Sequence, residues 1–375
     1  GRKLPELEIE VRFLLRAPLI IDTVKKIADA LDVSLGCPPL EGCFNEIIMG
    51  TKSSNKYLHK ASQAKNDDFY TQLSDIEREL SHYKDHLKNK VVLCNCDDPR
   101  ISNFFHYFSY NFEFIGLKKL ITTCYKNQQV DLFSQNNSEK AIYLEYTGNK
   151  NNDKVPDLSE IGIKHLKGDG DFRSKECIEL LKQSDIVVTN PPFSLFREYV
   201  TQLIEYDKKF VIIGSLNAIT YKEIFKLIKN NKLWLGYGFS GGNAYFKTPY
   251  PKEFADGVYN KETGLVKFRN VAWFTNLEIQ KRYEDLILYK TYKGNEKDYP
   301  KYDNYDAINI DKTKDIPADY AGAMGVPISF LDKYNPKQFE ILGNEYDLKI
   351  EKGRGYINGK RKYGRIFIKN KKVKK

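Results

Sequence analysis

Four consecutive residues, Asn190, Pro191, Pro192 and Phe193, follow the apolar run 186–188 with only Thr189 between. Proline cannot donate a hydrogen bond to a sheet, and it holds the residue before it in an extended conformation. The run therefore predicts a strand that ends in a rigid, extended exit. An amide side chain, a backbone carbonyl and an aromatic ring are held together at that exit. These groups can therefore position a bound molecule.

The side-chain oxygen of Asn190 and the carbonyl of Pro191 are both hydrogen-bond acceptors. At a strand end, this pattern resembles motif IV of the amino methyltransferases, which move a methyl group from S-adenosylmethionine to an exocyclic amine. An adenine amine is a poor nucleophile because its lone pair is delocalised into the ring. The resemblance implies that the two acceptors bond both amine hydrogens and restore the lone pair for in-line attack, with the prolines keeping them rigid.

Phe193 fits the same chemistry. A base inside a duplex cannot reach such a site, so it has to be flipped out at a cost of a few kcal/mol. Stacking on an aromatic face returns about 1–3 kcal/mol. The predicted catalytic residues are Asn190, Pro191, Pro192 and Phe193.

A cofactor site is expected at the end of an earlier strand, in the stretch "VVLCNCDDPRISNFF". Asp98 and Pro99 match the opening of the amino methyltransferase motif Asp-Pro-Phe-x-Gly-x-Gly. The remainder departs from it, because Arg100, Ser102 and Phe104 stand where the motif has a phenylalanine and two glycines. This departure puts the usual close backbone approach to the methionine moiety in doubt. The predicted cofactor contacts here are Asp97, Asp98 and Pro99.

Two further segments resemble cofactor motifs of the same enzymes. In "GDGDF", Asp171 would accept a hydrogen bond from the adenine amine of the cofactor, and Phe172 would pack against its ring. In "DDFYTQ", residues 69–71 would close over the methionine end. A loop and ordinary core packing are the alternative interpretations of these segments. The predicted contacts are Phe69, Tyr70, Thr71, Asp169, Gly170, Asp171 and Phe172.

The motifs together resemble the EcoRI-type adenine-specific DNA methyltransferases of restriction-modification systems, over residues 50–345. They are "DDFYTQ", "CNCDDPR", "LKGDGDFRSKECIELL", "DIVVTNPPFSLFREYV", "GFSGGNAYF" and "GVPISFLDKYNPKQFEILG". The resemblance implies methylation of adenine N6 in a short site of double-stranded DNA, with the second adenine of GAATTC as the leading hypothesis. It also implies S-adenosylmethionine as cofactor, a monomer, and a separate cognate endonuclease.

Alternating strand and helix signals predict an α/β fold. Continuous apolar strands favour a parallel, Rossmann-like S-adenosylmethionine-dependent methyltransferase sheet with helices on both faces and ligands at the carboxyl ends of the strands. Ser74, with Glu77 three residues later, predicts a capped helix start. Strands are expected at 90–96, 118–125, 141–146, 185–190 and 208–214, and further helices at 174–183 and 194–206.

The chain divides by character into three parts. Residues 1–48 are an N-terminal extension with an amphipathic helix, residues 49–275 a catalytic domain, and residues 276–375 a C-terminal DNA-recognition region. In the middle part, the glycine-rich stretch 236–246 predicts a mobile loop whose aromatic residues line the pocket of the flipped base. An ordinary surface loop is the alternative for that stretch.

Positive charge is concentrated at the C-terminal end. The chain has 60 Lys and Arg against 50 Asp and Glu, and residues 331–375 hold 14 against 5, so this segment carries +9 of the +10. Asn358 and Gly359 predict a tight hairpin turn, which suits binding to a polyanion, although a solvated tail is the alternative. The hairpin would display Lys360, Arg361, Lys362 and Arg365, with Tyr356 and Tyr363 between them.

Other classes are disfavoured. No run approaches the roughly 20 apolar residues of a membrane span and no secretory signal pattern is present, so the cytoplasm is expected. Cys94 and Cys96 lack the histidines of a zinc site, so no metal is predicted. Methylation of cytosine N4, of RNA or of a protein glutamine remains an alternative, as does a catalytically silent DNA-binding protein. Asn190 favours adenine, because cytosine N4 enzymes usually carry serine there.

Overall fold

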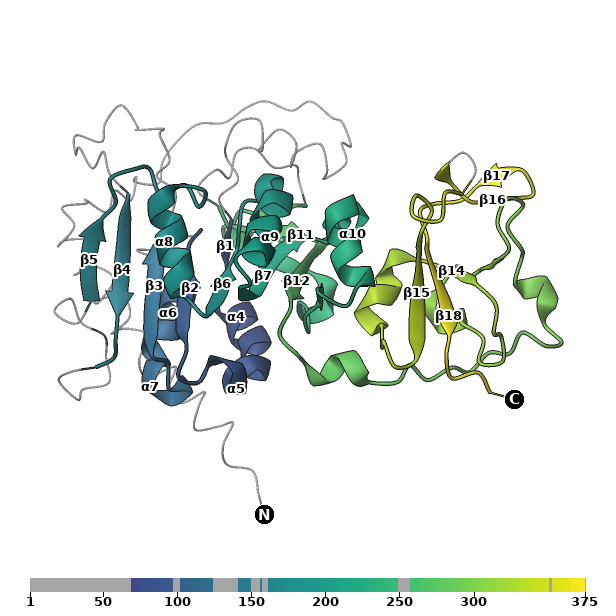
Figure 1. The fold of residues 1–375 in the computed structure, drawn as a ribbon, viewed down its shortest axis with the longest axis horizontal. Helices are drawn as coiled ribbons and strands as arrows, with labels where there is room; N and C mark the ends of the chain where they lie inside the picture. Colours follow the sequence, from purple (N-terminus) through teal and green to yellow (C-terminus); the bar gives the residue numbers. More distant parts are fainter. Residues whose placement is uncertain are drawn as a thin grey trace, which may run out of the picture. The chain divides into compact units, whose positions relative to one another are not determined.

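The structure is a computed structural model, and it describes most of the chain (Figure 1). The described residues are 69–96, 102–123, 141–149, 156, 161–248, 257–350 and 353–374. The helix expected in residues 1–48 and the predicted contacts Asp97, Asp98 and Pro99 lie outside them. The chain forms two compact units: one holds the described residues up to Lys208 and those of Asn243–Arg269, and the other holds Lys209–Gly242 and those of Asn270–Lys375.

The first unit contains five strands of a mixed sheet (Figure 1). Its strands are β2 Val91–Cys94, β3 Lys119–Thr123, β4 Ile142–Tyr146, β5 Ile161–His165 and β6 Ile186–Thr189. They run in the order β5-β4-β3-β2-β6. β2 is parallel to both β3 and β6, and every residue of β2 and β6 is buried, as expected for strands covered on both faces.

The expectation of a wholly parallel sheet was wrong. β4 pairs antiparallel with β3, and β5 pairs antiparallel with β4. The physical reason is visible in β4, where buried Leu144 and Tyr146 alternate with half-buried Tyr143 and Glu145. Glu145 forms ion pairs with lysines on the neighbouring strands. This alternation is typical of an antiparallel strand with one wet face, whereas continuous apolar runs are typical of parallel strands.

The helices predicted at 174–183 and 194–206 begin and end close to the predicted positions, as α8 Lys175–Gln183 and α9 Phe196–Glu205. Ser174 caps α8 as a serine should, because its hydroxyl oxygen accepts a hydrogen bond of 3.2 Å from the backbone N–H of Cys177. The capping prediction for Ser74 was wrong, because the strand before it leaves Gln72 extended and the helix starts at Leu73. The helices are α4 Leu73–Leu80, α5 Lys84–Leu87, α6 Asn103–Tyr110, α7 Phe112–Ile115, α8 Lys175–Gln183 and α9 Phe196–Glu205.

A second, small sheet in the first unit joins segments that lie far apart in the sequence. It has the order β1-β9-β11-β10, and the adjacent pairs are antiparallel. Thr71 of β1 is paired with Phe246 of β9, and Phe246 is paired in turn with Val266 of β11. The strands are β1 Tyr70–Thr71, β9 Ala244–Lys247, β10 Tyr259–Asn260 and β11 Leu265–Phe268.

The second unit begins with the predicted strand at 208–214, which is β7 Lys209–Ser215. β12 Val271–Thr275 lies antiparallel to β7, and β8 Trp234–Leu235 lies antiparallel to β12. α10 Lys222–Lys229 has its buried residues on one face.

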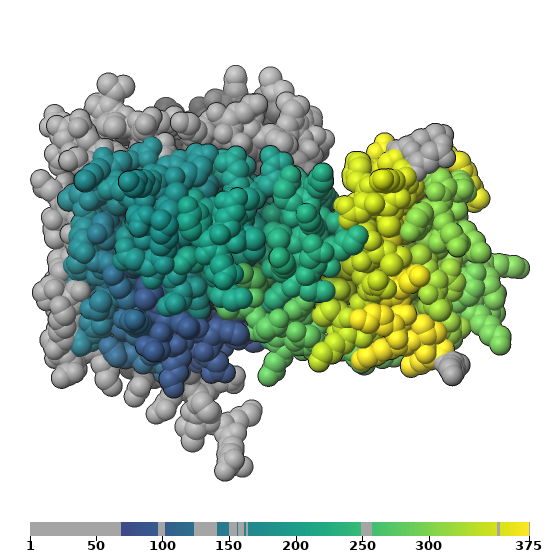
Figure 2. All heavy atoms as spheres, viewed as in Figure 1, coloured from purple at the N-terminus to yellow at the C-terminus, as the bar shows by residue number. Residues whose placement is uncertain are grey.

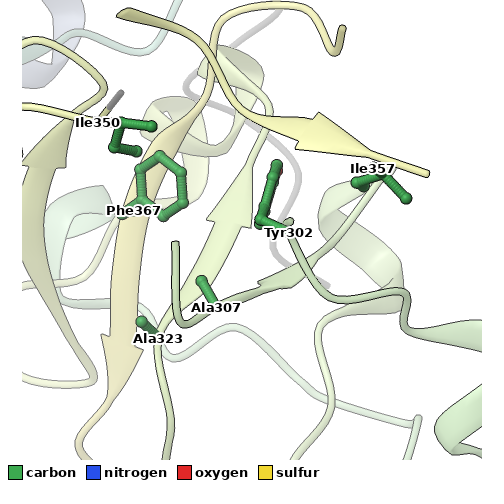
Figure 3. Packing of buried hydrophobic residues seen from close by; sticks show 6 residues of the cluster. All are labelled: Tyr302, Ala307, Ala323, Ile350, Ile357 and Phe367. Carbon is green, nitrogen blue, oxygen red and sulfur yellow. The ribbon is translucent and has the colours of Figure 1, made fainter. Parts of the chain in front are cut away.

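A four-stranded sheet forms the rest of the core of the second unit. Its strands are β13 Ile308–Asn309, β14 Met324–Val326, β15 Phe339–Asn344 and β18 Ile366–Asn370, in the order β13-β14-β18-β15. A cluster of buried side chains covers it: Tyr302, Ala307, Ala323, Ile350, Ile357 and Phe367 (Figure 3).

Short 3₁₀ helices in both units complete the fold. They are Ser81–Tyr83, Phe193–Leu195, Leu216–Thr220, Ser240–Gly242, Gln280–Tyr283, Glu296–Asp298, Thr313–Asp315 and Ile328–Lys333.

The predicted hairpin is confirmed. β16 Tyr356–Ile357 pairs antiparallel with β17 Lys360–Arg361, and the two turn residues Asn358 and Gly359 have φ of 50° and 71°. Positive φ at both turn residues is the type I′ geometry that an Asn-Gly pair favours.

Within the part of the chain that the structure describes, no helix is long and apolar enough to cross a membrane, and no group of His, Cys, Asp and Glu could hold a metal ion.

Candidate active site

Asn190 is the first residue after β6, and it lies against the segment that begins at Phe69. Its side-chain Nδ2 donates a hydrogen bond of 2.5 Å to the backbone carbonyl of Phe69. Its Oδ1 is buried and accepts no hydrogen bond from any described residue. Since the carbonyl of Phe69 requires a donor, the amide has one orientation, and that orientation leaves Oδ1 available.

Several buried side-chain oxygens of the described residues have no hydrogen-bond partner, and Oδ1 of Asn190 is the one that stands in the turn after β6. Leaving one unsatisfied costs about 1–3 kcal/mol, because the group has lost its water and gained nothing in exchange. The residue as a whole is only 7% exposed, so burial applies to the entire side chain. Asn190 is therefore arranged to receive a hydrogen-bond donor that the described residues do not supply.

The two prolines form the expected stiff exit from β6. Pro191 is buried, and Pro192 has an extended backbone with φ of −53° and ψ of 125°. The carbonyl of Pro192 accepts a hydrogen bond of 3.0 Å from the N–H of Leu195, which starts the 3₁₀ turn Phe193–Leu195 ahead of α9. The predicted sequence of strand, rigid turn and helix is confirmed.

Phe193 lies in a cluster of four phenylalanine rings. Its ring is stacked on that of Phe69 with 6.2 Å between centroids, and it meets Phe246 and Phe268 edge-on at 6.5 Å each. Phe69, Phe246 and Phe268 are buried, whereas Phe193 is half-buried. Phe193 is thus the ring of the cluster that is partly accessible to a bound molecule.

Phe268 was not among the predicted site residues. It comes from β11, whose residues alternate between half-buried and buried, with Val266 and Phe268 on the buried face. That alternation is readable in "LVKF" as a strand signal, but the pairing of β11 with β9 is a long-range contact that no local pattern predicts.

The segment 69–71, which was predicted to close over the methionine end of the cofactor, lies beside Asn190. Phe69 supplies both the carbonyl that fixes Asn190 and a ring of the aromatic cluster. The carbonyl of Thr71 accepts a hydrogen bond of 2.6 Å from Nδ2 of Asn103, at the start of α6. Thr71 is 1% exposed, and its hydroxyl oxygen has no hydrogen-bond partner among the described residues. Tyr70 is held in β1 opposite Lys247.

The segment 169–172 forms a tight loop between β5 and α8. Oδ1 of Asp169 accepts a hydrogen bond of 3.1 Å from the N–H of Asp171, and Gly170 between them has a φ of 80°, a conformation that glycine adopts at little cost. The ring of Phe172 is buried edge-on against Tyr199, with 5.0 Å between centroids. The loop is held in one conformation by its own contacts.

Asp171 is already bonded to an arginine. Its carboxylate accepts three hydrogen bonds from Arg173: from the backbone N–H at 2.8 Å, from Nε at 3.0 Å and from Nη2 at 2.7 Å. These side-chain hydrogen bonds hold the pKa of Asp171 below its ordinary value, so the group is an ionised acceptor at neutral pH. Two carboxylate oxygens offer about four acceptor positions, so capacity for one more donor remains.

Tyr199 of α9 connects the two predicted cofactor regions. Its hydroxyl donates a hydrogen bond to Oδ1 of Asn95, the first residue after β2, while its ring packs on Phe172. Gln202, one turn along α9, donates a hydrogen bond of 3.1 Å to the carbonyl of Phe172. Burial raises the pKa of Tyr199 well above its ordinary value, so the hydroxyl keeps its proton and remains a donor.

Asn95 and Tyr199 were also missed by the sequence-based predictions. The position of Asn95, directly after an apolar strand, was the available signal. Through Tyr199, the end of β2 and the loop 169–172 are both tied to the helix that follows the Asn-Pro-Pro-Phe turn.

Comparison with known proteins shows the family to which the chain belongs. A family model described as "Adenine-specific methyltransferase EcoRI" matches residues 57–371. The chain belongs to the EcoRI family of adenine-specific methyltransferases. The predictions that it is an enzyme and an adenine-specific methyltransferase are confirmed, and the family disfavours the alternatives of cytosine N4 methylation and of a catalytically silent protein.

Curated relatives of the chain carry the same type of activity in their names. Type II methyltransferase M.EcoRI of Escherichia coli is 51% identical over 330 residues, which cover 87% of this chain and 100% of that protein. Two mycoplasma proteins are each 39% identical over 336 residues, covering 84% of this chain. They are Type II methyltransferase M.MgeORF184P of Mycoplasma genitalium, covered to 99%, and Type II methyltransferase M.MpnI of Mycoplasma pneumoniae, covered to 98%. No solved structure matches the chain.

Proposed function

We propose that this methyltransferase transfers a methyl group from S-adenosylmethionine to the N6 amino group of a flipped adenine in double-stranded DNA. The observation that carries the proposal is the buried Oδ1 of Asn190, which has no donor among the described residues although the rest of the amide is fixed. An exocyclic amine is the kind of donor that such an acceptor suits, and the family is specific for adenine.

Asn190 and Pro191 act on the amine as a pair of acceptors. Oδ1 of Asn190 takes one amine hydrogen and the carbonyl of Pro191 takes the other, which draws the nitrogen toward a tetrahedral geometry and restores its lone pair. Because Nδ2 is anchored on Phe69, Oδ1 needs no reorganisation when the base arrives. An amide oxygen is too weak a base to keep a proton at neutral pH, so the proton released from N6 passes on to water.

Phe193 holds the flipped base. Its half-buried ring stands at the edge of the aromatic cluster, where it replaces the neighbours that the base loses when it leaves the duplex. Stacking of about 1–3 kcal/mol offsets the few kcal/mol of unstacking. The rigid Pro191-Pro192 exit fixes the distance between this ring and the acceptor.

The chemistry of the described residues fits the cofactor. S-adenosylmethionine supplies an electrophilic methyl group on a cationic sulfur, and its amines and hydroxyls are hydrogen-bond donors. Asp171 offers an ionised carboxylate to a donor, and the buried hydroxyl of Thr71 has no partner among the described residues. We assign cofactor binding to Phe69, Tyr70, Thr71, Asp97, Asp98, Pro99, Asp169, Gly170, Asp171 and Phe172, within a Rossmann-like sheet.

The target of the reaction is the second adenine of GAATTC. The likeness to M.EcoRI, at 51% identity over its whole length, supports this site. We propose that residues 49–275 form the catalytic domain, that residues 276–375 recognise DNA, and that residues 1–48 are an extension. The enzyme then works in the cytoplasm as a monomer and protects DNA from a separate restriction endonuclease.

A methyl-transfer assay tests the proposal. The protein is incubated with methyl-labelled S-adenosylmethionine and a duplex that contains GAATTC, or with a matched duplex whose second adenine is already N6-methylated on both strands. Label should enter the first duplex and not the second. If the protein binds the cofactor and yet labels neither duplex, the proposal is wrong.

A further inference from the structure

The hairpin β16–β17 is held rigidly at its turn. Both carboxylate oxygens of Asp303 accept hydrogen bonds from the turn, from the N–H of Asn358 at 3.0 Å and from that of Gly359 at 2.8 Å. The N–H of Asp303 in turn donates to the carbonyl of Tyr356 at 2.8 Å. A two-stranded hairpin by itself is marginally stable in water, so these bonds supply what its short strands lack.

The base of the hairpin is anchored in the core of the second unit. Ile357 is buried in the cluster around Tyr302 (Figure 3). Asn304 accepts a hydrogen bond of 3.1 Å from the N–H of Tyr356 and donates one of 2.9 Å to the carbonyl of Arg354. The cluster also requires a small residue beside the hairpin, since a Cβ on Gly355 would come within 2.5 Å of the Tyr302 ring. The hairpin is therefore a fixed projection and not a loose tail.

The four cations predicted on the hairpin separate into two pairs. Lys362 and Arg365 form ion pairs with Asp311, at 3.8 Å and 3.1 Å. Lys360 and Arg361 are exposed and have no ion pair or side-chain hydrogen bond with any described residue. Asp311 offsets one of the two inner charges, whereas the outer pair presents its full charge to solvent.

An aromatic side chain follows the outer cations. Tyr363 is 87% exposed, the largest exposed fraction among the exposed large hydrophobic residues that the structure describes. The yellow C-terminal segment that contains the hairpin lies at the surface of the second unit (Figure 2). Exposed cations with a neighbouring tyrosine hydroxyl match the donors that contact phosphate oxygens in protein–DNA interfaces.

We propose that the hairpin β16–β17 docks on the phosphate backbone of duplex DNA through Lys360 and Arg361. This rests on the proposed function and names the surface that binds its substrate. A two-stranded β-ribbon is narrow enough to lie along the major groove, which is about 12 Å wide. A rigid projection loses little conformational entropy on binding, so the release of counterions from DNA translates into affinity.

The test uses the full-length protein and a double variant, Lys360→Ala with Arg361→Ala. Fluorescence anisotropy gives the Kd for a labelled GAATTC duplex at several salt concentrations. Each phosphate contact contributes about 0.9 to the slope of log K against log salt, so the slope should become shallower by about two. We expect Kd to rise about tenfold at 0.1 M salt, with the affinity for S-adenosylmethionine unchanged.

A matched control removes two exposed lysines of the second unit that lie outside residues 276–375, Lys226→Ala with Lys232→Ala. This control should keep the parental Kd within about twofold. The conservative variant Arg361→Lys should keep the parental salt slope, because a phosphate contact depends on the charge.

An unchanged Kd and an unchanged salt slope in the double variant would overturn the docking proposal, whatever else the hairpin contacts. The failure of the proposed function has a different signature, in which the parent protein binds S-adenosylmethionine but labels no DNA. Circular dichroism of the double variant confirms that it remains folded, which is expected because both side chains are exposed.

Discussion

Asn190 and Asp171 are both proposed as acceptors for an adenine amine, one on the substrate and one on the cofactor, but the protein treats them differently. Asn190 is 7% exposed, is fixed through Nδ2, and has an Oδ1 that accepts no hydrogen bond from any described residue. The Asp171 side chain is 24% exposed and already accepts three hydrogen bonds from Arg173. The acceptor proposed for catalysis makes no hydrogen bond through Oδ1, whereas the acceptor proposed for cofactor binding is oriented and ionised by a neighbouring cation.

The difference follows from what each group has to do. An acceptor that acts on the transition state is most effective when it is fixed in advance and shielded from water, even though its burial costs stability. An acceptor that only binds has no such need, and a cation beside it lowers the cost of its charge. The following variants test this contrast, beginning with the largest expected effect.

Asn190→Ala removes the unused acceptor and should lower the rate of methyl transfer by at least about 10²–10³-fold, the loss typical of one preorganised polar group at a reaction centre. Affinity for S-adenosylmethionine should stay near the parental value. Rapid-quench assays with saturating cofactor and DNA measure the rate. A variant that methylates as fast as the parent would remove Asn190 from the reaction.

Phe193→Ala removes the half-buried ring and should lower kcat/KM by about 10–100-fold, since stacking of a base is worth about 1–3 kcal/mol. Phe193→Tyr is the matched control, and it should stay within a few-fold of the parent because its ring has the same face. Steady-state kinetics with a GAATTC duplex measure both. Equal losses in the two variants would argue against stacking.

Asp171→Ala should weaken S-adenosylmethionine binding by about tenfold, because one charge-assisted hydrogen bond is worth about 1.5–3 kcal/mol and part of that is screened at an exposed site. The maximal rate at saturating cofactor should change little, in contrast to Asn190→Ala. Isothermal titration calorimetry gives the affinity. Glu198→Gln, which removes the other ion-pair partner of Arg173, is the control and should leave the affinity unchanged.

The last prediction concerns the pH dependence of stability. It should differ between the region around Asn190 and the loop that holds Asp171. Burial lowers the pKa of His106 in α6 to about 4, while an unfolded histidine has a pKa near 6.5. The unfolded state therefore binds the extra proton as pH falls from about 6.5 to 4, and stability decreases in that window by about 1–3 kcal/mol. α6 also carries Asn103, which holds Thr71 on the Asn190 side.

Asp171 should add no slope between pH 5 and 8, because its pKa is lowered further below that range by Arg173. Urea unfolding at pH 7.5 and pH 5 measures both expectations. His106→Gln should flatten the pH dependence, and a slope that persists in this variant would assign it to another group.

Local signals predicted most of the turn at residues 190–193. The apolar strand β6, the two prolines and the helix after them depend on neighbouring residues, and the structure has them in the predicted order. The hairpin turn at Asn358 and Gly359 was equally predictable, because type I′ geometry is a property of that residue pair.

Long-range pairing was not predictable in the same way. The sheet β1-β9-β11-β10 joins three segments that lie far apart in the sequence, near residues 70, 246 and 266. It places Phe268 beside Phe193, and no local pattern specifies these partners. The side-chain partners of Asn190 and Asp171 were also hidden in the sequence. Arg173 lies two residues from Asp171, but only the loop geometry around Gly170 brings its guanidinium onto that carboxylate.

The central claim is that the unused Oδ1 of Asn190 carries the reaction, and Asn190→Asp tests it most directly. Aspartate keeps an acceptor at that position but loses the donor that Phe69 requires. In single-turnover methylation of a GAATTC duplex, the account predicts that Asn190→Asp is slower than the parent and clearly faster than Asn190→Ala. An Asn190→Asp variant that is no faster than Asn190→Ala would contradict the account.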